Sequence, residues 1–100
     1  MTEAFVAHLR RRLVESDVPE QLHDGLVHYV GERRPVGQFL TAVLSNDLKG
    51  ACARADVICQ VHLHSLVFFL YNYAPGGCWG SPEHVRGWLS EDEAPAEVFE

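Results

Sequence analysis

The sequence has few residues that carry recognisable chemistry. Three cysteines, an odd number without a Cys-x-x-Cys pair, favour reduced thiols over a disulfide framework. Only 8 basic residues stand against 14 acidic ones, so nothing attracts a nucleic-acid backbone in general. The first residues lack an apolar run of signal-peptide length. We therefore expect a cytoplasmic protein that binds no nucleic acid polymer.

The acidic excess is concentrated at the end of the sequence. Five of the 14 acidic residues lie in 91–100, which leaves residues 1–90 with 8 basic and 9 acidic side chains. The segment after Ser90 also contains Pro95. We expect a single helical domain over 1–90 and a disordered acidic tail over 91–100.

The apolar pattern predicts an all-α protein. Apolar residues recur every three or four positions in 2–15, 39–44 and 82–89, whereas no useful stretch alternates as a strand would. Proline and glycine punctuate the connections, for example in 31–37 and 75–77. We expect five or six short helices, joined by tight turns, in a compact bundle around a buried central helix.

Small polar residues predict where several helices begin. Thr2, Asp56 and Ser81 can each accept a hydrogen bond from an unpaired amide of the following first turn. Ser45, Asn46 and Asp47 compete with helical continuation because their side chains bond the nearby backbone. We expect them to end one helix and to cap a short one over 48–54. Pro19 suits the first position of a second helix.

The longest apolar stretch is the predicted central helix over 57–73. Its second half is apolar on every side, which is typical of a helix that is surrounded by partners. Gln60, His62 and Asn72 are among the polar residues that interrupt it, so we do not expect a membrane span. We expect it to be enclosed by its own chain or by a second copy, and therefore predict a homo-oligomer.

Cysteine and histidine offer weak candidates for chemistry. Cys59 and His62 are three residues apart and could bind zinc together with Cys78, but there is no second paired motif. Cys78 precedes a predicted helix start, which could activate its thiol. The alternative is that Cys78 and Trp79 plug their loop into the core. We predict no enzyme, no metal and no cofactor, with the cysteines as buried apolar groups.

A set of polar residues lies at predicted helix ends. These side chains could simply cap helices, with Arg54 bridging carboxylates from two ends. They could instead surround a small concave site walled by Tyr71, Tyr73 and Trp79. Both interpretations stay open at this point. The candidate ligand-binding residues are Asn46, Asp47, Arg54, Asp56, Tyr71, Asn72 and Trp79.

Four stretches within 19–89 carry a resemblance to a known family. They are FLTAVLSNDL at 39–48, RAD at 54–56, FLYN at 69–72 and CWGSP at 78–82. The chain resembles short, largely uncharacterised helical proteins that bacteriophages and other bacterial mobile elements encode. It departs from them at Cys52, where relatives often have an aromatic residue, and after Asp56, where they are more polar.

The resemblance implies a small protein that binds host factors, such as an inhibitor of a host defence system. We therefore expect a non-enzymatic binding module whose partner is a host protein. The alternative is a sponge for a signalling nucleotide, with stacking on Tyr71, Tyr73 or Trp79 and charge pairing from an arginine. Arg33, Arg34 and Arg54 are the candidates for that pairing. A third option is an enzyme built on Cys78 or on a histidine–carboxylate pair.

Overall fold

The computed structural model describes residues 2–91, and these residues form helices without any strand. This confirms the all-α prediction. The acidic tail predicted over 91–100 lies outside the described residues, apart from the backbone of Glu91. The helices are α1 (Glu3–Glu15), α2 (His23–Glu32), α3 (Gln38–Leu44), α4 (Leu48–Arg54), α5 (Val57–Val61), α6 (Leu63–Tyr73) and α7 (Pro82–Glu91), with short 3-10 turns at η1 (Glu20–Leu22) and η2 (Gly76–Cys78).

The helix starts follow the predicted capping residues. The hydroxyl of Thr2 accepts from the Phe5 amide at 3.1 Å, and that of Ser81 accepts from the His84 amide at 3.1 Å. The carboxylate of Asp56 accepts from the amide three residues on at 2.8 Å, and Asp47 does the same for α4 at 3.0 Å. These bonds satisfy amides that have no partner within the helix, so the predicted caps are confirmed.

The break between α3 and α4 is also confirmed. Asn46 has a φ of 63°, in the left-handed region that asparagine tolerates better than most residues. The Asp47 amide donates back to the Ala42 carbonyl at 2.8 Å, which satisfies the end of α3. At the same end, the Leu44 carbonyl accepts from the Gly80 amide at 2.7 Å, so the loop before α7 is held against α3.

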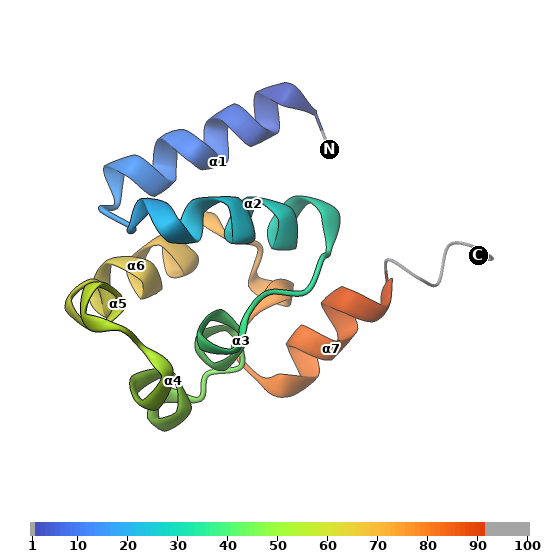
Figure 1. The fold of residues 1–100 in the computed structure, drawn as a ribbon. Coiled ribbons are helices and arrows are strands. Elements are labelled where there is room, and N and C mark those ends of the chain that lie inside the picture. The colour runs from blue at the N-terminus through green and yellow to red at the C-terminus, as the bar shows by residue number, and fades with distance from the viewer. Residues whose placement is uncertain (1, 92–100) are drawn as a thin grey trace.

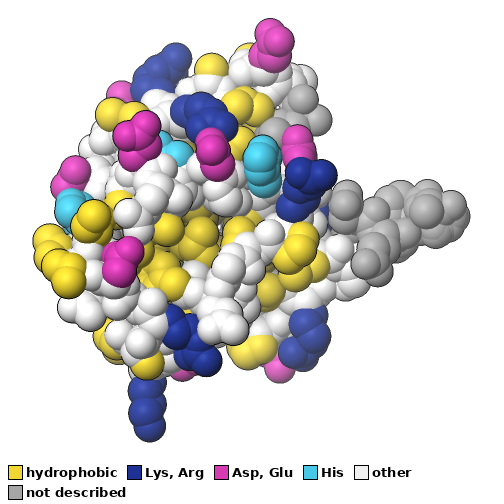
Figure 2. Space-filling model, viewed as in Figure 1, with side chains coloured by type: hydrophobic (Ala, Val, Ile, Leu, Met, Phe, Trp, Pro, Cys, Tyr) yellow, Lys and Arg dark blue, Asp and Glu magenta, His cyan; other side chains and the backbone are white. Residues whose placement is uncertain are grey.

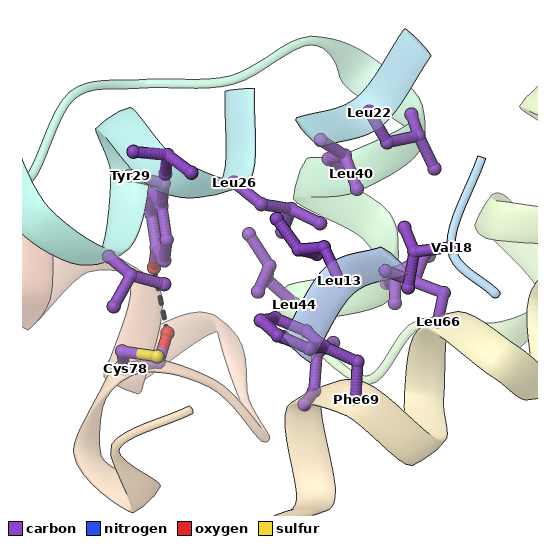
Figure 3. Close-up of a cluster of buried hydrophobic side chains, with 14 of the residues drawn as sticks. Leu13, Val18, Leu22, Leu26, Tyr29, Leu40, Leu44, Leu66, Phe69 and Cys78 are labelled. Atoms are coloured by element: carbon purple, nitrogen blue, oxygen red, sulfur yellow. Dashed lines mark hydrogen bonds between the residues drawn. The ribbon is translucent and has the colours of Figure 1, made fainter. Parts of the chain in front are cut away.

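The core lies where α1, α2, α3 and α6 meet. In Figure 1, α1 lies alongside α2, and α3 is seen nearly end-on between α4 and α7; α1 also contacts α6. Figure 3 shows Leu13, Leu26, Leu44 and Phe69 converging from these four elements, and all four are fully buried. Their removal from water is the main favourable contribution to folding.

The end of α2 is attached to η2 and α7 by polar contacts inside the apolar cluster. The Tyr29 hydroxyl donates to the Cys78 carbonyl at 2.8 Å, as Figure 3 shows. The Trp88 indole donates to the Tyr29 carbonyl at 2.7 Å, and the Arg33 guanidinium lies 3.7 Å from the centre of the Trp88 ring. Cys78 is fully buried and Trp79 is partly buried against the core, which confirms that this loop is plugged into the protein.

The predicted central helix is corrected in two respects. It is not continuous, because it divides at His62 into α5 and α6, which raises the number of α-helices among residues 2–91 to seven. It is also not enclosed by its own chain. Val57, Val61 and Tyr71 expose 73%, 72% and 80% of their surface. A chain this short has one core, so α6 turns one side towards it and leaves the other uncovered.

The residues of α6 divide cleanly between its two sides. Leu66, Phe69 and Leu70 follow the i, i+3, i+4 pattern and are buried, whereas Val67, Phe68 and Tyr71 alternate with them and are exposed. Enclosure by a second copy therefore stays a prediction. Among residues 2–91, no helix has both the length and the apolar character needed to cross a membrane.

Candidate functional site

The structure does not bring the predicted site residues into one place. Asp47 and Arg54 line one cleft together, and Asn46 and Trp79 line a separate small cavity that Asp47 also borders. Asp56 lies at the start of α5, and Tyr71 and Asn72 lie on the exposed side of α6. The aromatic side chains that were predicted as walls are therefore separated from the arginine that was predicted as the charged group.

One cleft lies between α3, α4 and the beginning of α7. Its volume is about 550 Å³, within the range of about 300–1,000 Å³ that small-molecule sites occupy. One side of α3 forms its floor, because the residues there follow the i, i+3, i+4, i+7 spacing of a single helix face. The lining residues are Val36, Gly37, Gln38, Thr41, Ala42, Ser45, Asp47, Arg54 and Pro82.

Arg54 lies at the edge of this cleft and is held by uncharged oxygens. Its Nε donates to Gln38 Oε1 at 3.4 Å, and its Nη1 donates to the Gly50 carbonyl at 3.3 Å. The prediction that Arg54 bridges two carboxylates is wrong, since no carboxylate among residues 2–91 forms an ion pair with it. The α3–α4 packing brings the Gln38 amide to it instead.

A second, smaller cavity of about 60 Å³ lies between α3, α4 and α6. Asn46 and Asp47 contribute its polar rim, and Trp79 contributes an aromatic wall. The remaining lining is aliphatic and includes Leu48 and Val67, which are both exposed on the outside. This volume has room for one small apolar group and not for a nucleotide.

The other predicted site residues have structural partners. Asp56 caps α5 and also accepts from the Gln21 side chain at 3.0 Å, which joins η1 to α5. Both hydrogen bonds lower the pKa of the Asp56 carboxyl, and the bond from the Cys59 amide has the larger effect. The Asn72 amide donates to the Phe68 carbonyl of its own helix at 2.9 Å. Tyr71 points outwards and carries no such bond to the described part of the chain.

The two buried thiols, Cys59 and Cys78, show no sign of activation. Burial raises the pKa of Cys78 from 9.0 to about 11, and burial with the neighbouring Asp56 carboxylate raises that of Cys59. An activated cysteine needs the opposite shift, because the thiolate is the nucleophile. Among residues 2–91, histidine, cysteine and carboxylate side chains form no group of three or more that could hold a metal ion.

Of the exposed apolar side chains of α5 and α6, only Tyr71 is among the predicted site residues. Six large residues there, Val57, Ile58, Val61, Val67, Phe68 and Tyr71, are exposed, and we call them the α5–α6 face. Figure 2 shows apolar side chains gathered at the left edge of the molecule, over α5. The sequence of 63–73 holds no signal for this exposure, because the residues on the exposed side of α6 are as apolar as those on its buried side.

Comparison of the chain with protein-family models, with curated proteins and with solved structures gives no match. The family resemblance over 19–89 therefore stays a prediction. Three features of the described residues are left from which to infer what the protein binds: the α5–α6 face, the cleft beside Arg54 and the small cavity behind Leu48.

Proposed function

We propose that this chain is a small, non-catalytic binding module that binds protein through the α5–α6 face. The observation that supports this most strongly is the exposure of large apolar side chains on two successive helices. Contiguous apolar surface on a small protein is typical of a protein interaction site. The raised pKa values of Cys59 and Cys78 support the non-catalytic part.

The first partner that we propose is a second copy of the chain. Residues 57–73 contain no aspartate, glutamate, lysine or arginine. In a two-fold interface the same surface patch meets itself, so a charge close to the symmetry axis would face its own copy. A face without charges avoids that repulsion, and it also matches the composition of interface cores, which are poor in charge and rich in aromatic residues.

The packing of α5 and α6 favours an interface that is already formed in the single chain. Asp56 and Gln21 hold the start of α5 against η1, and the His62 Nδ1–H donates to the Ile58 carbonyl at 2.9 Å where the two helices join. Leu66, Phe69 and Leu70 anchor α6 in the core. Association would therefore cost little ordering of the backbone.

Sedimentation velocity of the full chain over a wide concentration range tests self-association. We expect the weight-average mass to rise above that of one chain as concentration increases. A mass of one chain throughout the micromolar range contradicts self-association through this face. A host protein as a further partner of the same face, which the family resemblance implies, would then be sought with a photo-crosslinker placed at Tyr71.

A further inference from the structure

We infer that the cleft between α3, α4 and the start of α7 is a binding site for a small zwitterion with an aliphatic body, such as an aliphatic α-amino acid. The inference does not rest on self-association, because the cleft shares no residue with the α5–α6 face. It rests on two opposite charges at one end of the cleft and on apolar side chains along the rest of it. Figure 2 looks onto this side of the molecule, where α3 lies between α4 and α7.

Arg54 supplies the group that would bind a carboxylate. A guanidinium has five N–H donors, and Arg54 uses one on Gln38 and one on the Gly50 carbonyl. Three donors, including both on Nη2, have no partner among residues 2–91. By contrast, Arg10 and Arg86 each form an ion pair with a carboxylate. A guanidinium whose hydrogen-bond partners are uncharged and which keeps spare donors suits a carboxylate ligand, which it can bind bidentately.

Asp47 supplies the group that would bind an ammonium. One carboxylate oxygen, Oδ1, accepts from the Gly50 amide, which leaves most of the acceptor capacity of Oδ2 unused. Oδ2 and the Nη1 atom of Arg54 both lie beside Gly50, at 2.2 Å and 3.1 Å from the position that a Cβ would occupy there. The two charges are therefore close neighbours, yet they form no direct ion pair.

The spacing of these charges suits one class of ligand better than others. A simple anion on Arg54 would be repelled by Asp47, and a simple cation on Asp47 would be repelled by Arg54. An α-amino acid carries its carboxylate and its ammonium on one carbon, so it can satisfy both side chains at once. No aromatic side chain lines the cleft, so it offers no stacking surface to a nucleotide base.

The rest of the cleft fits the aliphatic part of such a ligand. Val36, Ala42 and Pro82 provide apolar walls, and the hydroxyls of Thr41 and Ser45 lie on the α3 side. Apolar walls with a few polar groups that fix orientation are the usual composition of a small-molecule site. The volume of about 550 Å³ leaves room for a branched side chain beside the charged end.

Isothermal titration of the full chain with three related probes tests the inference. The probes are L-leucine, N-acetyl-L-leucine, which keeps only the carboxylate, and L-leucinamide, which keeps only the ammonium. We expect L-leucine to bind and each blocked compound to bind at least about tenfold more weakly, as expected for the loss of a charge-assisted hydrogen bond. No binding of L-leucine at millimolar concentration, or equal binding of a blocked compound, overturns the inference.

Three substitutions assign the binding to this cleft. Asp47→Asn removes the charge but keeps the helix cap, because asparagine caps helices as well as aspartate does. Arg54→Gln removes the guanidinium. Both should weaken L-leucine binding at least about tenfold. Arg86→Gln is the matched control, since Arg86 pairs with Glu83 outside the cleft, and it should bind as the parent does.

Each variant is first checked for the parent's melting temperature and sedimentation mass, so that a loss of folding is not read as a loss of binding. If Asp47→Asn is folded and binds L-leucine with unchanged affinity, the assignment to this cleft is wrong. If self-association through the α5–α6 face fails, the sedimentation mass is that of one chain, while leucine binding is not affected. The two proposals can therefore fail independently.

Discussion

Replacing Val61 by lysine tests the role of the α5–α6 face. Val61 ends α5 with 72% of its surface exposed. Full burial of a valine side chain stabilises by about 1.5–3 kcal/mol, so about 1–2 kcal/mol remains to be gained by covering this one. A symmetric dimer covers two copies, which doubles the effect to about 2–4 kcal/mol. Val61→Lys should therefore raise the dimer dissociation constant by about 30-fold to several hundredfold.

The folded single chain should tolerate this substitution. Lysine in the last turn of a helix interacts favourably with the helix dipole, and the position faces water. Val14→Lys is a matched control, because Val14 lies in the last turn of α1 with 67% of its surface exposed. It lies on the α2 side of α1, one turn after Arg10, which pairs with Asp24. We expect Val14→Lys to associate as the parent does.

Sedimentation equilibrium of the three proteins side by side gives the dissociation constants, and circular dichroism confirms that each is folded. We expect a higher dimer dissociation constant for Val61→Lys than for the parent, and the same constant for Val14→Lys as for the parent. Equal dissociation constants for all three would refute the assignment of the interface to the α5–α6 face. Equal weakening by both lysines would show a general charge effect and would refute it too.

Four further predictions concern the core, the cysteines and a helix cap. Tyr29→Phe should lower the free energy of unfolding by about 1–3 kcal/mol in urea, because it leaves the buried Cys78 carbonyl without its hydrogen bond; an unchanged midpoint would contradict this. In the native protein at pH 8, iodoacetamide should label the exposed Cys52 and leave Cys78 unmodified, which mass spectrometry reads directly. The pKa of Cys78 is raised to about 11, so the folded state holds the thiol proton more tightly than the unfolded state does. The free energy of unfolding should therefore fall as the pH rises from 9 towards 11. Cys78→Ala should make this pH dependence flatter. Asp56→Ala should lower the melting temperature at pH 7 more than Asp56→Asn does, because asparagine still caps α5. Since folding lowers the pKa of the Asp56 carboxyl, the parent should lose its extra stability over Asp56→Asn as the pH falls below the ordinary pKa of aspartate.

Local signals in the sequence predict where four of the seven α-helices among residues 2–91 begin. Thr2, Asp47, Asp56 and Ser81 cap helices through bonds to residues three positions away, so the signal is complete within one turn of the chain. The burial of the loop at Cys78 could also be predicted, because glycines let an apolar cysteine and tryptophan fold inwards.

The side of α6 that faces water, and the pairing of polar groups from different helices, depend on how the helices pack. A helix that is apolar all round carries no record of the side on which its own chain packs, and here that side holds Leu66 and Phe69 while Phe68 and Tyr71 remain outside. Arg54 likewise meets Gln38 rather than a carboxylate because α3 packs beside α4. Contacts between residues far apart in the chain depend on how whole helices pack, and local capping signals contain no information on that.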